Sequence, residues 1–163
     1  MGANVEIERK FRVLPERLPP LSGLQAKRLS QFYLGEGFDP AFRVRIVDET
    51  QAWLTIKGRS TGLSAPEFEY EIPLADAREM AQVLRASVVV EKTRYLLPQG
   101  SLVWELDVFA GANAGLVMAE IELDKEDQVV DLPDWCGAEV STDPRFKNIN
   151  LALNPYRDWR DQA

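Results

Sequence analysis

The stretch VEIERKF, residues 5–11, shows a pattern that most of the chain repeats. In an extended strand, side chains two residues apart share one face. Glu6, Glu8 and Lys10 therefore lie on one face of this strand, and Val5 and Ile7 lie on the other. Two carboxylates and an ammonium on one face suit a hard metal ion beside an anion, although a half-solvated edge strand would show the same pattern.

Period-two alternation returns along the chain and predicts a mainly β fold with two helices. The predicted strands after the first cover residues 25–34, 41–47, 52–57, 67–72, 88–97, 102–109 and 116–123. Helical spacing predicts one helix over residues 74–86. Asp143-Pro144 is a typical helix start and predicts a second helix over residues 145–153. No linker or repeat interrupts the pattern, so residues 1–163 are predicted to form one domain.

Charges on the polar strand faces are sorted by sign. Basic pairs and acidic pairs at positions i and i+2 are Arg43 with Arg45, Lys92 with Arg94, Glu69 with Glu71, Glu105 with Asp107, and Glu120 with Glu122. Two like charges roughly 7 Å apart repel by about 2 kcal/mol at an effective dielectric near 20. A face that only meets water would mix its signs. Sorted blocks favour a barrel whose wet lumen takes a polyanion and divalent cations. In the predicted strand over residues 25–34, Lys27 and Arg28 face opposite ways, and which of them meets the lumen stays open.

Composition excludes several kinds of protein. The 163 residues are 45% apolar and 28% charged, with a net charge of −7, which argues against a general nucleic-acid surface. Because there is no histidine, mechanisms that need a histidine base are excluded, and acid–base work falls to other groups. With Cys136 as the only cysteine, neither an internal disulfide nor a usual zinc site is possible. Without a signal-peptide pattern or a membrane-length apolar run, a cytoplasmic protein is expected.

Ordered motifs resemble those of the CYTH superfamily, also called the triphosphate tunnel metalloenzymes. EIERK at residues 6–10 is similar to the E-x-E-x-K signature of that family. It is followed in order by AFRVRI, LTIKG, EFEYEIP, EKTRY, WELDVF, AEIEL and DPRFKNINLALNP. The match covers nearly the whole chain and resembles the small bacterial single-domain members. It implies an α+β, mainly β fold, in which eight antiparallel strands close into a tunnel with a few flanking helices.

The resemblance also implies roles for individual residues. Phosphate oxygens would be bound by Lys10, Arg43, Arg45, Lys57, Arg94 and Lys147. One or two Mg²⁺ or Mn²⁺ ions would be held by Glu6, Glu8, Asp107, Glu120 and Glu122. Catalytic positions would be Lys92 as general base, Tyr33 in support of it, and Glu69 and Glu71, which position bases or water. Lysine normally titrates near 10.4, so a base role for Lys92 needs a lowered pKa.

The expected activity is metal-dependent hydrolysis of a triphosphate, with inorganic tripolyphosphate cleaved to pyrophosphate and phosphate. Within the family, a thiamine triphosphatase, an ATPase or an adenylyl cyclase is the alternative. An organic substrate would need an aromatic shelf, for which Trp53, Phe32 and Tyr33 are candidates. A non-catalytic polyphosphate or nucleotide sensor is a second alternative, which the acidic blocks disfavour. The expected partner is a triphosphate-bearing small molecule, with no nucleic acid and no membrane, and a homodimer would cover apolar outer faces.

Overall fold

The computed structural model describes residues 4–35 and 39–162, and strands make up most of its regular structure. The strands are β1 (Val5–Val13), β2 (Ala26–Leu34), β3 (Ala41–Val47), β4 (Gln51–Lys57), β5 (Ser64–Ile72), β6 (Val90–Gln99), β7 (Leu102–Phe109), β8 (Val117–Glu122) and β9 (Cys136–Glu139). The α-helices are α1 (Leu74–Val83) and α2 (Asn148–Leu153). Short 3-10 turns cover Pro15–Arg17, Gly111–Asn113, Pro144–Phe146, Tyr156–Asp158 and Arg160–Gln162. None of the helices described is long and apolar enough to cross a membrane.

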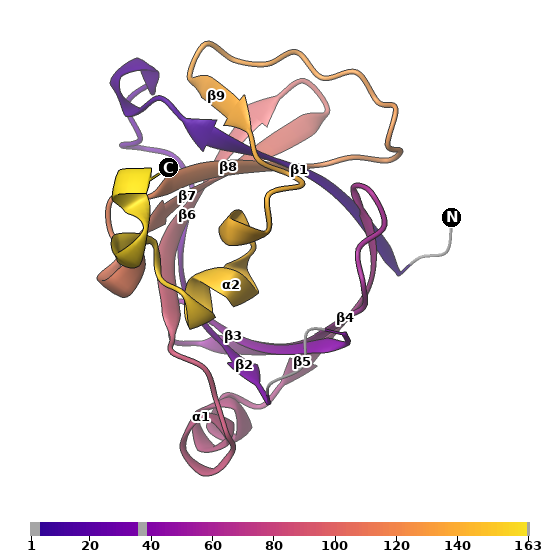
Figure 1. Cartoon of the computed structure of the whole chain (residues 1–163), viewed down its shortest axis with the longest axis vertical. Helices are drawn as coiled ribbons and strands as arrows, with labels where there is room; N and C mark the ends of the chain where they lie inside the picture. The colour runs from indigo at the N-terminus through magenta and orange to yellow at the C-terminus, as the bar shows by residue number, and fades with distance from the viewer. Residues whose placement is uncertain (1–3, 36–38, 163) are drawn as a thin grey trace.

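Eight strands form an antiparallel barrel, which Figure 1 shows as a ring. Their order is β5-β4-β3-β2-β6-β7-β8-β1, and pairing between β1 and β5 closes the ring. The closing pairs are Val5 with Pro66, Glu6 with Ala65 and Ile7 with Ser64. The predicted eight-stranded closed barrel is confirmed. The ninth strand, β9, was not predicted, and it pairs with the end of β1.

Strand register places the charged faces inside the barrel, because residues that pair across two strands share a face. Lys10 of β1 lies opposite Glu120 of β8, and Arg94 of β6 lies opposite Asp107 of β7. These side chains are all buried, and Asp107 is completely inaccessible. Lys10, Arg94, Asp107 and Glu120 therefore meet inside the barrel, whereas Glu69 and Glu71 of β5 are exposed.

The apolar outer face of one half of the barrel is covered by two long connections. Phe11 and Trp104 are buried there, and their rings meet edge to face with centroids 5.6 Å apart. Trp135, which precedes β9, packs on Trp104 at 5.3 Å. Leu18 and Leu21, from the connection between β1 and β2, pack against the same cluster. These contacts bury apolar surface that would otherwise face water, and burial of this kind stabilises the fold.

Helix α1 covers another part of the outer face. Its Ala77 is fully buried against a cluster that includes Phe32, Val44 and Ala52. The helix starts directly after Pro73. It ends at Val83, and the backbone of Leu84 is already extended. It is therefore shorter than the predicted helix over residues 74–86.

The C-terminal segment packs into one end of the barrel, and Figure 1 shows α2 lying across the ring. Buried apolar residues of this segment and of the inward strand faces form one cluster, which includes Tyr33, Phe109, Met118, Phe146, Leu151, Tyr156 and Trp159. The predicted helix over residues 145–153 is divided in two. Lys147 is extended between the turn Pro144–Phe146 and α2.

Part of the outer surface of β3, β4 and β5 stays uncovered in this chain. Phe42 pairs with Ile56, which pairs in turn with Phe68, so these side chains form one row across three strands. Phe42, Phe68 and Tyr70 are exposed at 39%, 40% and 54%.

Candidate active site

A cavity of about 890 Å³ occupies the barrel lumen and reaches α2. Most residues that the sequence nominates for the site line this cavity, and they come from all parts of the chain: Glu6, Glu8, Lys10, Tyr33, Arg43, Arg45, Lys57, Glu69, Arg94, Glu120, Glu122 and Lys147. Three further nominated residues, Lys92, Asp107 and Glu71, lie outside the cavity lining.

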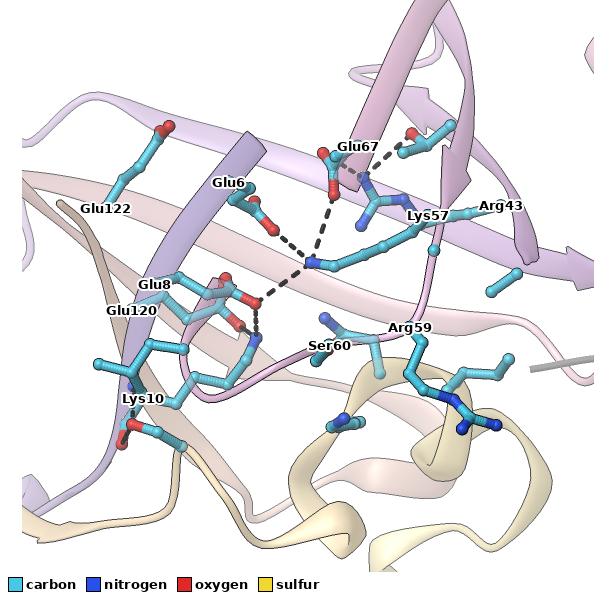
Figure 2. Close-up of a pocket in the computed structure, with 18 of the residues that line it drawn as sticks. Glu6, Glu8, Lys10, Arg43, Lys57, Arg59, Ser60, Glu67, Glu120 and Glu122 are labelled. Carbon is cyan, nitrogen blue, oxygen red and sulfur yellow. Dashed lines mark hydrogen bonds and ion pairs between the residues drawn. The ribbon is translucent and has the colours of Figure 1, made fainter. Parts of the chain in front are cut away.

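Two lysines hold the carboxylates of β1 and their neighbours (Figure 2). Lys57 Nζ contacts Glu6 in a short ion pair and lies 3.4 Å from Glu8 Oε1. Lys10 Nζ lies 3.1 Å from Glu8 Oε1 and donates a hydrogen bond of 2.7 Å to Glu120 Oε1. Glu8 is therefore shared by both ammonium groups, which joins the two lysines into one network.

The pKa of each carboxylate follows its surroundings. Burial, together with the neighbouring charge of Glu8, raises the pKa of Glu6 to about 7, although Lys57 opposes the shift. Burial also acts on Glu120, but Lys10, Lys92 and Arg94 outweigh it and hold the pKa of that carboxyl well below its usual value. Burial raises the pKa of Glu122 as well, and Glu122 forms no ion pair with a described residue.

Arg43 and Arg45 point into the lumen from β3, and both lack part of their expected bonding. Arg45 Nε donates to Gln31 Oε1 at 3.2 Å, yet Arg45 forms no ion pair with a residue in the described ranges. Burial and the charges of Arg43 and Arg94 lower the pKa of Arg45 to about 10. Arg43 donates to Thr55 and Glu69, but its Nε is buried without a hydrogen-bond partner. Buried guanidinium groups in this state are suited to an incoming anion.

Arg94 is fixed by carboxylates on two neighbouring strands. Asp107 accepts both Arg94 Nε and Arg94 Nη2 at 2.7 Å, and Glu120 accepts Nη2 at 2.7 Å. Lys92 donates a short hydrogen bond to the same Asp107 from behind. Both Asp107 oxygens therefore already accept hydrogen bonds from the Arg94 guanidinium or the Lys92 ammonium. The side chains of Asp107 and Lys92 are inaccessible to solvent.

Three residues nominated as catalytic, Lys92, Tyr33 and Glu71, lie in different surroundings. Burial and Arg94 lower the pKa of Lys92 to about 8, in the direction that a base needs, although its ammonium faces Asp107 and the Phe109 ring. Tyr33 lines the cavity, and its hydroxyl accepts a long hydrogen bond of 3.4 Å from Gln31 Nε2. Glu71 is exposed and lies opposite Trp53. The predicted roles of these side chains stay predictions.

Sequence reasoning assigned no role to Glu67, a carboxylate that lines the lumen cavity. Its Oε2 lies 3.3 Å from Lys57 Nζ and its Oε1 lies 3.7 Å from Arg43 Nη2. Glu67 Oε2 is buried without a hydrogen-bond partner. The signal was present, because Glu67 precedes the nominated Glu69 by two residues and so shares its face.

Further cavity residues come from segments outside the barrel strands. Arg59 and Ser60 follow β4, and Asn148 and Asn150 belong to α2. Arg59 is largely exposed and lies 3.3 Å from Asp39. Only the folded chain brings these segments to the same cavity.

The three aromatic residues proposed as a shelf for an organic group do not come together. Phe32 is buried under α1, and Tyr33 belongs to the cluster around α2. Trp53 shares the face of Arg45, with which it pairs, but it does not line the cavity. An aromatic shelf built from all three is therefore absent.

In the described part of the chain, no three acidic, histidine or cysteine side chains form a ready-made metal site. Most of the lumen carboxylates are turned toward a lysine or an arginine instead. Among the described residues, Arg45 and Glu122 have no ion pair, and Arg43 Nε and Glu67 Oε2 are buried without a hydrogen-bond partner. Such a cavity has bonding capacity left for both an anion and a cation.

Known proteins share this chain's sequence and fold. An inorganic triphosphatase of Acetivibrio thermocellus is 42% identical over 156 residues, which is 96% of this chain and 98% of that protein. An inorganic triphosphatase of Nitrosomonas europaea is 40% identical over 154 residues, covering 91% of this chain and 97% of that protein. A crystal structure of an inorganic triphosphatase superposes with a TM-score of 0.66 at 35% identity, covering 94% of this chain and 97% of the other.

The family model for the CYTH domain matches residues 4–152. That range includes every strand of the barrel and all the residues described in the cavity. The chain belongs to the CYTH domain family.

Proposed function

We propose that this protein is an inorganic triphosphatase, which hydrolyses tripolyphosphate to pyrophosphate and phosphate with a divalent cation. The observation that carries the proposal is the pair of lumen arginines that keep unused bonding capacity. Arg45 has no ion pair with a described residue, and Arg43 keeps a buried Nε without a partner. A polyanion in the lumen would satisfy both. The names of the similar proteins support the same substrate.

Positive groups surround the space that such an anion would occupy. Phosphate oxygens would be bound by Arg43, Arg45, Arg94, Lys10, Lys57 and Lys147, which all line the cavity. Phosphoryl transfer depends mainly on alignment and charge neutralisation, so a set of fixed cations is itself a large part of the catalytic apparatus. Arg94 is held most firmly, because Asp107 orients its guanidinium in a bidentate pair.

The carboxylates of the lumen fit a hard divalent cation. Glu6, Glu8, Glu120 and Glu122 are oxygen donors on the adjacent strands β1 and β8, and Glu67 adds a buried oxygen without a hydrogen-bond donor. Mg²⁺ and Mn²⁺ both prefer such ligands. When bound, the cation would neutralise phosphate charge and acidify a coordinated water.

The protein's own side chains would prepare the substrate for attack by water. Thr55 donates to Glu69 at 2.8 Å, and Glu69 accepts from Arg43, which sets the direction of that guanidinium. Asp107 would act through Arg94, which it orients. The proton of the attacking water would go to a group in or beside the cavity, and Lys92, with its pKa lowered to about 8, is the candidate from the sequence.

The test is phosphate release from tripolyphosphate with Mg²⁺ or Mn²⁺, with and without chelator, and with ATP and thiamine triphosphate as competing substrates. R45Q should lower kcat/KM by roughly 100-fold, as loss of one fixed contact to transition-state charge does. The matched control is R28Q, because Arg28 is exposed on the outer face of β2 and should leave activity unchanged. Absence of turnover with any metal, together with anion binding that survives chelator, would identify a sensor.

The exposed row on β3, β4 and β5 supports a further proposal about assembly. Phe42, Phe68 and Tyr70 form an apolar surface of the kind that a second copy of the chain would cover. Light scattering of the wild type and of an F42S/F68S variant tests for a homodimer, and a wild-type mass of one chain would refute it.

A further inference from the structure

Lys57 lies where three carboxylates converge. Its ammonium contacts Glu6 in a short ion pair, Glu8 Oε1 at 3.4 Å and Glu67 Oε2 at 3.3 Å, and Figure 2 shows all three around it. These carboxylates come from β1 and β5, the two strands whose pairing closes the barrel. Lys10 also pairs with Glu8, and Arg43 with Glu67, so Glu6 is the carboxylate of the three that has Lys57 as its sole ion-pair partner among the described residues.

The ammonium does not saturate the oxygens around it. Glu67 Oε2 is near Lys57 but has no hydrogen bond, and the Lys57–Glu8 contact is long. An ammonium offers three hydrogen bonds to these oxygens. A divalent cation carries twice the charge and takes carboxylate oxygens at about 2.0–2.6 Å. The two cations would need the same oxygens, so they exclude each other at this point.

The Lys57 ammonium has an alternative binding partner, the anion that Arg43 would bind. Arg43, with its unmatched Nε, lies on the neighbouring strand and contacts Glu67 from the other side. The anion that would satisfy Arg43 therefore lies within the same group of side chains. The lysine stem is flexible, and 27% of the Lys57 side chain is exposed, so the ammonium is not locked in by packing.

We propose that Lys57 is an exchangeable internal cation. In the metal-free protein it holds Glu6, Glu8 and Glu67 together, and it gives up these carboxylates to a divalent cation and turns to the phosphate chain. The inference rests on the proposed function, and it adds Glu67 to the carboxylates that meet the metal. It follows that metal and anion binding support each other, because each removes a competitor of the other.

Lysine labelling tests the exchange directly. Mass spectrometry would follow acetylation of Lys57 in the wild-type protein with and without Mg²⁺, with Mg²⁺ binding measured separately by calorimetry. Labelling of Lys57 should rise by at least about threefold when Mg²⁺ binds, since loss of its ion pairs exposes the amine. The control is Lys147, which lines the same cavity but has no ion pair with a described residue, and its labelling should not change.

Variants test the same competition from the metal's side. K57Q should bind Mn²⁺ more tightly than the wild type, by at least about threefold, in titrations that follow the free aqueous ion by electron paramagnetic resonance. R59Q is the control, because it removes one positive charge from the cavity mouth, where the Arg59 side chain pairs with Asp39 and is 82% exposed. The Mn²⁺ affinity of R59Q should stay within about twofold of the wild-type value. K57R keeps the positive charge in a planar guanidinium group that pairs with carboxylates in bidentate geometry. K57R should therefore bind Mn²⁺ no more tightly than the wild type.

Several results would overturn the exchange: bound Mg²⁺ with unchanged Lys57 labelling, no Mg²⁺ binding at all, or a K57Q affinity for Mn²⁺ no better than that of R59Q. The labelling experiment needs no variant, so a K57Q protein that fails to fold does not remove the test. None of these measurements involves turnover. A protein that passes them and does not hydrolyse tripolyphosphate would refute the proposed function and leave the exchange standing.

Discussion

Glu6 and Glu8 are two residues apart on one strand face, yet their pKa values move in opposite directions. Burial raises both, but Glu8 meets Lys10 as well as Lys57, and these two lysines outweigh burial and lower its pKa. Glu6 is buried, faces Glu8 and Glu67, and has Lys57 as its one ion-pair partner in the described ranges, so its pKa rises to about 7. At neutral pH, the fold therefore disfavours the charged form of Glu6.

This difference predicts how stability depends on pH in an E6Q variant. Because the pKa of Glu6 is higher in the folded protein than its ordinary value of 4.5, the folded state binds the proton more tightly than the unfolded chain. The contribution of Glu6 to the free energy of unfolding therefore falls as pH rises from 4.5 to 7. Without metal, E6Q should unfold with a free energy higher than wild type by on the order of 1–3 kcal/mol at pH 8, and the gain should shrink toward pH 5.

Denaturant unfolding of the chelator-treated protein at both pH values measures this gain. E16Q is the control, because Glu16 is exposed in a surface turn and forms no ion pair with a described residue. A larger loss of stability for E6Q at pH 8 than at pH 5 would mean that the ion pair with Lys57 outweighs burial.

At the scale of elements, the C-terminal segment depends on one buried amide. The Asn113 side chain donates to the Leu151 carbonyl at 3.3 Å and accepts the Tyr156 backbone N–H at 2.8 Å. It is 1% exposed, so neither partner has water as a substitute. Asn113 thus joins the turn after β7 to α2, the helix that lies across the barrel end.

N113A should lower the free energy of unfolding by about 1–3 kcal/mol, because it leaves two buried backbone groups unbonded. N154A is the matched control. Asn154 is exposed at the end of α2, and its amide makes no side-chain hydrogen bond to the described residues, so a change within about 0.5 kcal/mol is expected. Thermal or denaturant unfolding checks both variants, and equal losses would show that the Asn113 bonds contribute nothing specific.

At the scale of the whole molecule, closure of the barrel is uneven. Three residue pairs join β1 to β5, whereas eight join β6 to β7. The short junction also carries Glu6 and is next to Lys57 and Glu67, which pair with each other and with further lumen charges. The junction between β1 and β5 is therefore expected to open more easily than the rest of the barrel.

Hydrogen exchange followed by mass spectrometry tests this expectation. Amides at residues 64–67 should exchange at least about tenfold faster than those at residues 102–109 in the metal-free protein. Equal protection of the two segments would show that the barrel opens only as a unit.

Much of the barrel could be predicted because alternation along a strand is a local property. The segment 102–109 was predicted with the bounds of β7, and AFRVRIV with those of β3. β9 was missed because CGAE is short and has no apolar alternation. The second helix was predicted as one piece because the extended backbone of Lys147 has no signal in the sequence.

The sequence by itself determined which side chains share a strand face, since that depends only on the two-residue period of the strand. It could not show which residues of two strands lie side by side, because that register is set by packing, and because the pairs β2–β6, β8–β1 and β5–β1 join strands that are far apart in the sequence. Only the tertiary structure turned Lys27 inward, opposite Arg94, and placed Asp107 behind Arg94, away from the cavity. Only the tertiary structure brought Glu67 to Lys57, because the ring must close before β5 and β1 present their carboxylates to one ammonium.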